Sequence, residues 1–457
     1  MLSRAGAALA TMVAAAGVAR ADGDLGPVSP RAVGHAGAAV VSDDGPGALF
    51  ACPAAMARRD GRRVQLGGLV VDDDVWLVGD DHPRISDRGP AELVPVIGGA
   101  GALGPVIVGI GFATTASIDR RLPQPEPGLP AATVLADFPH RYGALDARWT
   151  RRTLALGVAA RPTEWLAIGV SGALSRVDAR ESRRVWAGFG RDMPLGYPMR
   201  DVIVAIDASD ALVPGGALGA LVAPADVPLE LALGASWTAN VDAAGGADIS
   251  VANTPPATGV NIQAPTTLAA GARAAGTFAS PLVLHAGVRW VGARYALEGG
   301  ATAWSYRAGG DSDDAWTITD ARVIDETGAS APIDRFATRI GRRSHAAVRA
   351  SVDVEVVPGF AWLSAGYAWR GAGQARNATT LGGVDRGGHT LALGAELTAG
   401  NAVITLGWSR QLARDTTVLA PGLPWDNPIA PEALPANLGT YGHSRDVVGI
   451  GVEIASP

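Results

Sequence analysis

Five basic side chains have the chemistry to bind an anionic group, and they lie in segments where polar and apolar residues alternate. They are Arg273, His285, Arg289, His345 and Arg349. A guanidinium or a protonated imidazole binds a carboxylate through charge-assisted hydrogen bonds. The alternative is that they form ion pairs with acidic residues of similar segments, namely Glu230, Asp353, Glu355, Glu396 and Glu453. We favour ion pairs, because a lone charge in a confined interior is costly.

Motifs of known enzyme classes are absent from the sequence. There is no G-x-S-x-G, no H-E-x-x-H and no Cys/His cluster with the spacing of metal ligands. We therefore expect no enzymatic activity, no cofactor and no metal site. The acidic runs at 72–74 and 311–314 fit divalent-cation binding or a solvated strand end and loop equally well. A net charge of -6 without a basic tract argues against nucleic acid as a partner.

The N-terminus has the pattern of a secretory signal. Arg4 precedes an apolar run over 5–19, and Ala19-Arg20-Ala21 forms an A-x-A cleavage site, so residues 1–21 are expected to be removed on export. The run is too short to span a bilayer. Cys52 is the one cysteine among 457 residues, which excludes an internal disulfide framework.

The elements that must position the basic residues are strands. In 345–356, valines and alanines at even positions alternate with His345, Arg349, Ser351, Asp353 and Glu355 at odd ones. The same alternation occurs in 282–290, 390–397, 401–408 and 447–454. Short connections at 160–164, 243–246, 357–359 and 400–401 alternate with long ones at about 119–139, 182–227, 298–335 and 417–440. Short turns on one side and long loops on the other are typical of an outer-membrane β-barrel.

The segments number fourteen, and an even count places both chain ends on the short-turn, periplasmic side. They are 62–79, 91–101, 105–118, 140–160, 164–181, 228–242, 246–253, 264–275, 281–297, 336–356, 360–376, 387–399, 401–416 and 441–455. We expect an all-β fold, a 14-stranded antiparallel transmembrane β-barrel over 62–457. Closure is required because lipid offers no partner to a backbone N–H or C=O.

Two alternatives compete with this fold. The uncharged run at 93–118 is long enough for a membrane helix, but two prolines, six glycines and many β-branched residues favour two strands. A soluble β-sandwich or propeller also has alternating strands, but it predicts turns of similar length at both ends. Tryptophans near segment ends instead favour a lipid-facing band with an aromatic girdle, and they are Trp165, Trp237, Trp290, Trp369 and Trp408.

Residues 22–61 are small, glycine-rich and turn-prone, and they precede the first strand. They are either a disordered leader or a plug that folds back into the barrel. The stretch "SPRAVGHAGAAVVSDDGPGALFACPAAMAR" resembles the N-terminal hatch of the FadL/TodX family of outer-membrane transporters for hydrophobic compounds. The matching residues are Arg31, Ala32, Gly34, Gly37, Asp43, Asp44, Pro53 and Ala54. Cys52 stands where the family usually has Asn. Segments "RYGALDARWTRRTLALGVAARPTEWLAIGVSGAL", "QAPTTLAAGARA", "SAGYAWRGAG" and "GGHTLALGAEL" resemble strands of the same family.

The resemblance implies passive transport of hydrophobic small molecules, such as long-chain fatty acids or aromatic hydrocarbons, with lateral release into the membrane. The expected setting is the bacterial outer membrane, where a monomer contacts lipid and lipopolysaccharide. A general porin or a structural barrel without a specific ligand is the alternative.

Two sets of residues are candidates for the transport path. The long loop at 182–227 contains large apolar residues that either capture substrate or pack over the barrel mouth, namely Val185, Trp186, Phe189, Met193, Leu195, Tyr197 and Met199. Gly109 and Gly111 in the third strand are candidates for a bulge through which substrate leaves.

Overall fold

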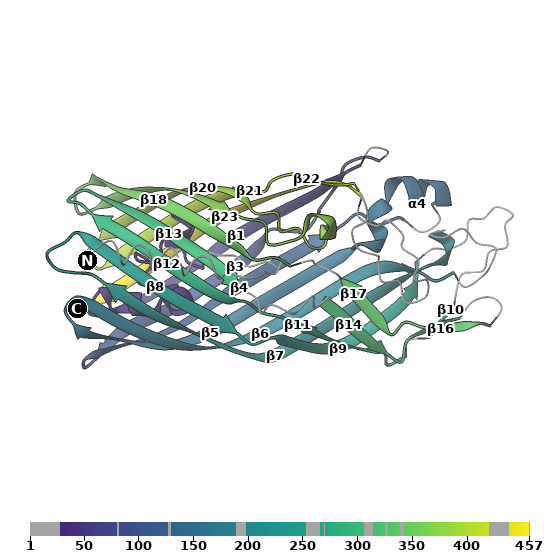
Figure 1. Cartoon of the computed structure of the whole chain (residues 1–457), viewed down its shortest axis with the longest axis horizontal. Coiled ribbons are helices and arrows are strands. Elements are labelled where there is room, and N and C mark those ends of the chain that lie inside the picture. Colours follow the sequence, from purple (N-terminus) through teal and green to yellow (C-terminus); the bar gives the residue numbers. More distant parts are fainter. Residues whose placement is uncertain are drawn as a thin grey trace.

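The computed structural model describes residues 28–79, 82–126, 129–188, 198–252, 266–268, 270–305, 314–324, 328–338, 342–419 and 438–456. The chain forms one closed antiparallel barrel with fourteen positions in its wall (Figure 1). The signal at 1–21 lies outside the described residues. None of the helices in the described part of the chain is long and apolar enough to cross a membrane.

Ten of the wall positions are single strands, and four are long strands interrupted near the middle. In order around the wall they are β1 (Arg62–Val78), β3 (Glu92–Leu103), β4 (Val106–Arg121), β5 (Asp146–Thr163), β6 (Leu166–Trp186), β7 (Asp201–Val222), β8 (Leu229–Thr238) with β9 (Val241–Val251), β11 (Arg273–Phe278) with β12 (Leu282–Val291), β13 (Tyr295–Ser305) with β14 (Asp314–Thr319), β17 (Arg335–Thr338) with β18 (His345–Val357), β19 (Ala361–Arg370), β20 (Gly388–Ala399), β21 (Ala402–Leu412) and β23 (Gly439–Ser456). The barrel closes where β23 pairs with β1, from Arg62 opposite Ser456 to Val78 opposite Thr440.

The remaining elements lie at the two ends and inside. Those of the long connections are β2 (Ile85–Ser86), α4 (Ala131–Asp137), η3 (Pro139–Tyr142), η4 (Pro198–Arg200), β10 (Thr266–Leu268), β15 (Arg322–Ile324), β16 (Ser330–Pro332), η5 (Arg376–Ala378) and β22 (Thr416–Val418). α4, β10, β16 and β17 all lie toward the long-connection end of the barrel (Figure 1). Inside the barrel lie α2 (Pro30–Gly34), α3 (Ala48–Ala51) and η2 (Pro53–Arg58).

The count of fourteen is confirmed, but two wall strands were missed and two others were each divided into two segments. The expected loop at 182–227 contains β7, and the expected loop at 298–335 contains most of β13. Conversely, 228–242 and 246–253 are two parts of one wall position, so the expected turn at 243–246 lies within β9. Likewise, the expected segments 264–275 and 281–297 belong to one wall position, which β11 and β12 form.

β7 was missed because Pro214 and two glycines resemble a turn. Pro214 lies where β7 changes partner, since Gly215–Val222 pair with β8 and Val202–Ser209 pair with β9. The ladder to β6 also shifts register here, between Ser175 and Val177. A strand tolerates proline at such an irregularity because no ladder hydrogen bond is required of it.

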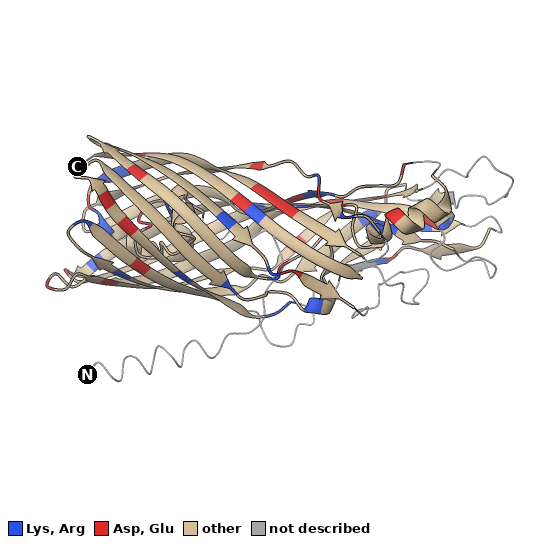
Figure 2. Cartoon of the chain, turned by 90° about the horizontal axis from the view of Figure 1, so that it is seen from above, with Lys and Arg blue, Asp and Glu red and all other residues tan. Residues whose placement is uncertain are grey.

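The outer face of the wall is apolar over its short-turn half. On β5, Leu154, Leu156 and Val158 are about half exposed, whereas Ala155 and Ala159, at the alternate positions, are buried. Trp165, Trp237, Trp369 and Trp408 are also exposed, as a girdle requires. Charged residues occupy a small part of the wall. They are scattered singly along the strands and at the two ends of the barrel (Figure 2).

Candidate functional site

The N-terminal segment fills the short-turn half of the barrel interior, and we call residues 28–61 the hatch. α2 begins after Ser29, whose Oγ accepts a hydrogen bond from the Ala32 amide and donates one to Asp43 Oδ2 at 2.7 Å. α2 packs on β20, β21 and β23, whereas α3 and η2 pack on β4 to β8. The hatch therefore contacts both halves of the wall.

Glycines in the wall allow the hatch to approach the strands closely. A Cβ at Gly169 of β6 would lie 2.5 Å from the Ala54 nitrogen, and one at Gly111 of β4 would lie 2.9 Å from Leu49 Cδ1. Cys52 lies in the same contact, buried, with Sγ 3.5 Å from the carbonyl oxygen of Leu233. A thiol thus donates weakly to the wall at this position.

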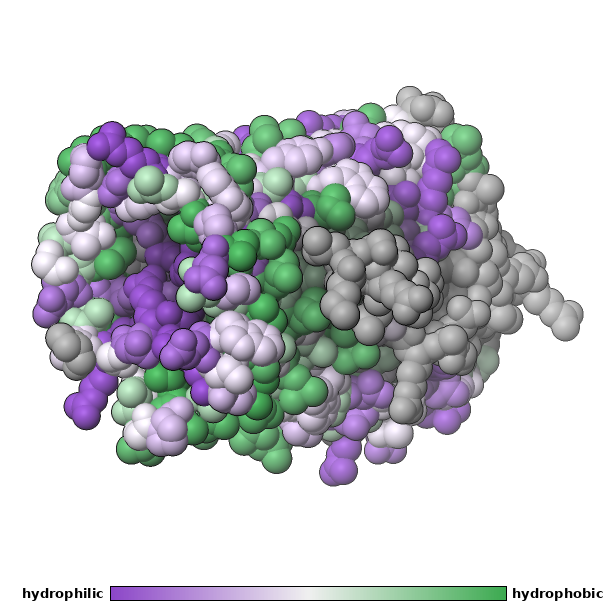
Figure 3. All heavy atoms as spheres, turned by 60° about the vertical axis from the view of Figure 1, so that its left-hand side comes forward, coloured by the Kyte–Doolittle hydropathy of each residue, from purple (hydrophilic) through white to green (hydrophobic). Residues whose placement is uncertain are grey.

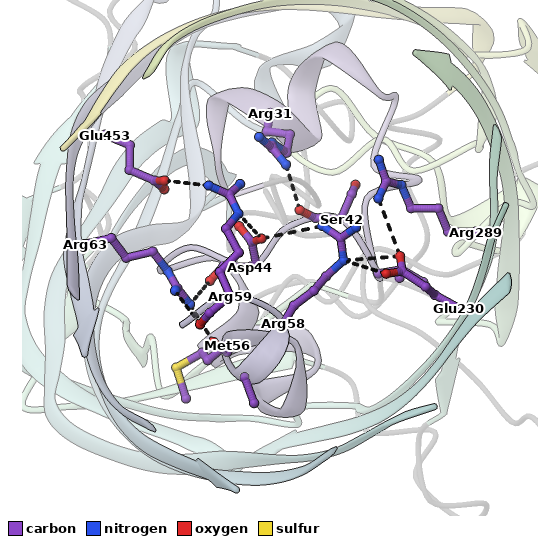
Figure 4. Close-up of polar contacts among 12 residues, drawn as sticks. Arg31, Ser42, Asp44, Met56, Arg58, Arg59, Arg63, Glu230, Arg289 and Glu453 are labelled. Atoms are coloured by element: carbon purple, nitrogen blue, oxygen red, sulfur yellow. Dashed lines mark hydrogen bonds and ion pairs between the residues drawn. The ribbon is translucent and has the colours of Figure 1, made fainter. Parts of the chain in front are cut away.

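Ion pairs join the hatch to the wall at its short-turn end (Figure 4). Arg31 pairs with Glu396 of β20, with Nε 2.6 Å from Oε1. Arg58 pairs with Glu230 of β8 at 3.1 Å, and Arg59 with Glu453 of β23 at 3.0 Å. In the reverse direction, Arg63 of β1 donates to the carbonyl oxygens of Asp44 and Met56, at 2.8 and 2.6 Å, and Glu298 of β13 accepts from the Val41 amide at 2.7 Å.

The acidic pair of the hatch has two different environments. Burial raises the pKa of Asp43 to about 6, although Ser29 and Arg31 act against it. Burial acts on Asp44 in the same direction, but Arg59, Arg31 and Arg58 outweigh it and lower the pKa of Asp44. His35, whose Nε2 lies 2.6 Å from Asp353 Oδ1, has a raised pKa because that carboxylate outweighs the effect of burial.

A cavity of about 210 Å³ lies above the hatch, between it and the wall. Its apolar lining includes Phe50 of the hatch, Val283 of β12 and Trp304 of β13. Its polar lining includes Arg151, His285, His345, Arg349 and Arg370. The Trp304 and His345 rings are stacked at 4.5 Å, and Arg349 lies over Trp304 at 5.6 Å.

Toward the long-connection end, an apolar core continues above this cavity. It includes Trp149, Ile206, Phe278 and Trp316, and Phe278 contacts both tryptophan rings edge-on at 5.1 and 4.9 Å. These side chains lie on the inward-facing parity of their strands. They were not predicted as site residues, although the same alternation of residue types that predicts the outward face also places them on the inward one.

A second cavity, of about 280 Å³, lies at the short-turn end beside the ion pairs. Its lining includes Arg31, Arg58, Arg59, Arg289, Asp353 and Glu396. Hydrophilic residues gather in a hollow at this end of the barrel (Figure 3). This side of the hatch is polar, in contrast to the mixed aromatic and cationic lining on the other side.

The five basic candidates separate into three groups. His285, His345 and Arg349 converge on the cavity above the hatch. Arg289 lies among Glu230, Glu298 and Asp353 at 3.5 to 3.7 Å, as the ion-pair interpretation expects. The expectation that Arg273 lies in the confined interior is wrong, because it is exposed at the start of β11, where its neighbours Ala272 and Ala274 are the buried ones.

The apolar loop candidates are only partly described. Val185 and Trp186 are buried at the end of β6, not in a loop. Phe189, Met193, Leu195 and Tyr197 lie outside the described residues, and of Met199 only the backbone, in η4, is described.

The bulge expected at Gly109 and Gly111 is in a different place. Both glycines lie in the regular β3–β4 ladder, opposite Ala100 and Gly98, and they face Met56 and Leu49 of the hatch. β4 instead shifts register against β5 between Thr114 and Ala116. Above the pair of Val96 with Ala113, β3 and β4 no longer pair.

In the acidic run at 72–74, Asp73 is partly buried and forms ion pairs with Arg120, His443 and Arg445, at 2.6 to 3.0 Å. In the described part of the chain no group of three or more potential ligands is placed to hold a metal. Most of 311–314 lies outside the described residues.

Comparison with known proteins identifies relatives by structure alone. No protein-family model and no curated protein matches the sequence. A Pseudomonas aeruginosa FadL homologue is 14% identical, with a TM-score of 0.69 over 94% of this chain and 98% of that one. The Ralstonia pickettii toluene transporter TbuX is 14% identical, with a TM-score of 0.65 over 95% of this chain and 100% of that one. The P. putida toluene transporter TodX is 13% identical, with a TM-score of 0.62 over 90% and 94%. The chain therefore has the fold of these proteins.

Proposed function

We propose that the chain is a bacterial outer-membrane protein that transports small hydrophobic molecules by passive diffusion. The observation that carries the proposal is the cavity above the hatch, which is enclosed in a barrel with an apolar outer band and lined by Phe50, Val283 and Trp304. The fold of proteins described as toluene transporters and a FadL homologue supports the same conclusion.

The direction of transport follows from the chemistry of the interior. An apolar molecule that enters from the long-connection end meets the core of Trp149, Phe278 and Trp316 and then the cavity. The hatch blocks the axial path beyond, with its charged side facing away. Movement down a concentration gradient into lipid requires no ATP.

For the exit we propose the wall beside the β4 bulge. Thr115 and Ala116 line the cavity at the register shift, and β3 does not pair with β4 at this level. Release there delivers the molecule sideways to lipid rather than to water.

A general porin is the competing function, and the close packing of the hatch argues against it. Wall glycines such as Gly169 and Gly111 are in contact with hatch atoms, and six ion pairs or hydrogen bonds described above fix its charged side. Such packing leaves little space for hydrated solutes.

The test is transport in liposomes that contain the purified chain. We expect entry of a labelled fatty acid or of toluene and no leakage of a sugar; sugar leakage without hydrophobic uptake would instead identify a porin. Val283→Trp fills the cavity and should reduce uptake severalfold. Val288→Trp, an outward-facing change on the same strand, is the matched control and should not reduce it.

A further inference from the structure

The outward face of β5 and β6 changes from leucine to arginine at a single level. Leu154 lies opposite Leu174, and the next outward pair is Arg152 opposite Arg176. Beyond this pair, Thr150 lies opposite Asp178, and Arg148 then lies opposite Arg180. The four arginine side chains are 47 to 60% exposed. We call Arg148, Arg152, Arg176 and Arg180 the arginine patch.

The level of the patch coincides with the edge of the apolar band. From Thr163 at the short turn to Leu154, β5 has about ten residues, which at a tilt of 35–45° cross an apolar band about 25 Å tall. Arg152 and Arg176 are the first outward residues beyond that length. In the proposed membrane setting, they therefore lie at the head-group level of the outer leaflet.

Both arginine pairs are unfavourable as they stand. Like charges directly opposite on neighbouring strands destabilise a sheet. Asp178 relieves one pair in part, because it contacts Arg152 at 3.0 Å and Arg176 at 2.9 Å. Asp119 on β4 and Asp207 on β7 contact the outer sides of Arg148 and Arg180. Since a guanidinium has five N–H donors, one shared carboxylate leaves donors for a further anion.

A neighbouring part of the wall, on the far side of β3 and β4 from the patch, has the reverse charge at the same level. On β1 and β23 the last apolar pair is Val70 and Val448, and the next outward pair is Asp72 opposite Asp446. Arg410 of β21 contacts Asp446 at 3.5 Å. The arginine patch is thus a feature of one side of the wall and not a general property of the rim.

We propose that the arginine patch binds the phosphate groups of the outer-leaflet glycolipid, the lipid A part of lipopolysaccharide. Guanidinium groups bind phosphate oxygens in a bidentate manner, and a phosphate between Arg152 and Arg176 neutralises their repulsion. The acyl chains of the same molecule then lie along Leu154, Leu156 and Leu174. This inference rests on the proposed outer-membrane location but not on the transported substrate.

The test uses the full-length chain in detergent micelles with bisphosphorylated lipid A, and native mass spectrometry counts bound lipid. We expect the double variant Arg152→Gln/Arg176→Gln to bind at least tenfold more weakly. Arg410→Gln, one arginine at the same level on the acidic side, should bind as the unaltered chain does. Raising the salt concentration should weaken binding to the unaltered chain, because the contacts are exposed.

Further arms identify the ligand and exclude misfolding. Lipid A without phosphates should not bind, and inorganic phosphate at the same concentration should not displace lipid A. Arg152→Lys/Arg176→Lys retains the charge, and its affinity for lipid A should lie between those of the unaltered chain and the glutamine variant. Heat-dependent gel mobility establishes that each variant is folded. Equal binding by the glutamine variant, or equal binding of dephosphorylated lipid A, overturns the proposal. Uptake into liposomes made without lipid A tests transport separately.

Discussion

Arg31 of the hatch and Glu396 of β20 form a two-point ion pair, although they are 365 positions apart. Arg31 Nε lies 2.6 Å from Oε1 and Nη2 lies 2.7 Å from Oε2. The two side chains are 17% and 21% exposed, so the pair is largely withdrawn from water. It ties the first helix of the hatch to a strand near the end of the chain.

Glu396→Gln should loosen the hatch without unfolding the barrel. Removing one partner of a largely buried pair costs about 3 kcal/mol, because the other charge remains buried. The rate at which a maleimide labels Cys52, the only cysteine, reports hatch opening, since its side chain is buried against β7 and β8. We expect at least tenfold faster labelling. Glu164→Gln at the exposed β5–β6 turn should label as the unaltered chain does.

Asp43 should make the hatch more stable in acid than at neutral pH. Its pKa is raised to about 6, so the stability it contributes is fully present below its ordinary value near 4 and is lost as pH rises through about 6. At pH 7 the ionised, buried carboxylate of Asp43 destabilises the hatch by about 2 to 3 kcal/mol, and Asp43→Asn removes this destabilisation. Labelling of Cys52, normalised to the unfolded chain at each pH, should be slower in the variant at pH 7 and unchanged at pH 4.

Asp44→Asn should have the opposite effect at pH 7. The pKa of Asp44 is lowered, so its stabilisation is present above its ordinary value and is lost as pH falls through the folded value. The variant should therefore label faster than the unaltered chain at pH 7. Equal effects of the two substitutions would contradict the separate environments of the acidic pair.

Gly169→Ala should displace the hatch, because the new methyl group would lie 2.5 Å from backbone atoms of Pro53 and Ala54. Overpacking of this kind costs about 1 to 3 kcal/mol, which corresponds to roughly 5- to 150-fold faster Cys52 labelling. Gly172→Ala is the control on the same strand, since no atom lies within 4 Å of its added carbon. Heat-dependent gel mobility should be unchanged in both.

Val352→Arg should impair insertion into the membrane. Val352 belongs to the outward parity of β18, near the middle of the apolar band, where an arginine costs about 2 to 4 kcal/mol. Val357→Arg, at the rim beside the short turn, should cost about 1 kcal/mol or less. Equal membrane yields of the two variants would refute the outward assignment of Val352.

The alternation of residue types was sufficient to predict the barrel but not every strand. Segments such as 345–356 and 401–412 have regular alternation, and they are strands in the structure. β7 and β13 contain Pro214 and Gly299-Gly300, which resemble turns when the partner strands are unknown. Long strands with a central interruption, such as β8 with β9, were in turn divided in two.

Contacts between the hatch and the wall could not be predicted, because they join residues hundreds of positions apart. The sequence contains 60 glycines, but it does not distinguish Gly169, which contacts the hatch, from Gly172, which does not. Likewise Arg273 and His285 both follow an alternating pattern, yet only His285 lines the cavity. Assignment of a side to each residue requires the pairing register.

The junction between β1 and β23 has a consequence for biogenesis. The wall is sealed by its first and last strands, so the cylinder stays open along one edge until the final eighteen residues of β23 arrive. The segment preceding β1 contacts both of these strands and the wall opposite. Its Arg59 pairs with Glu453 of β23 at 3.0 Å, so this contact between the hatch and the last strand cannot form until the C-terminal strand is in place.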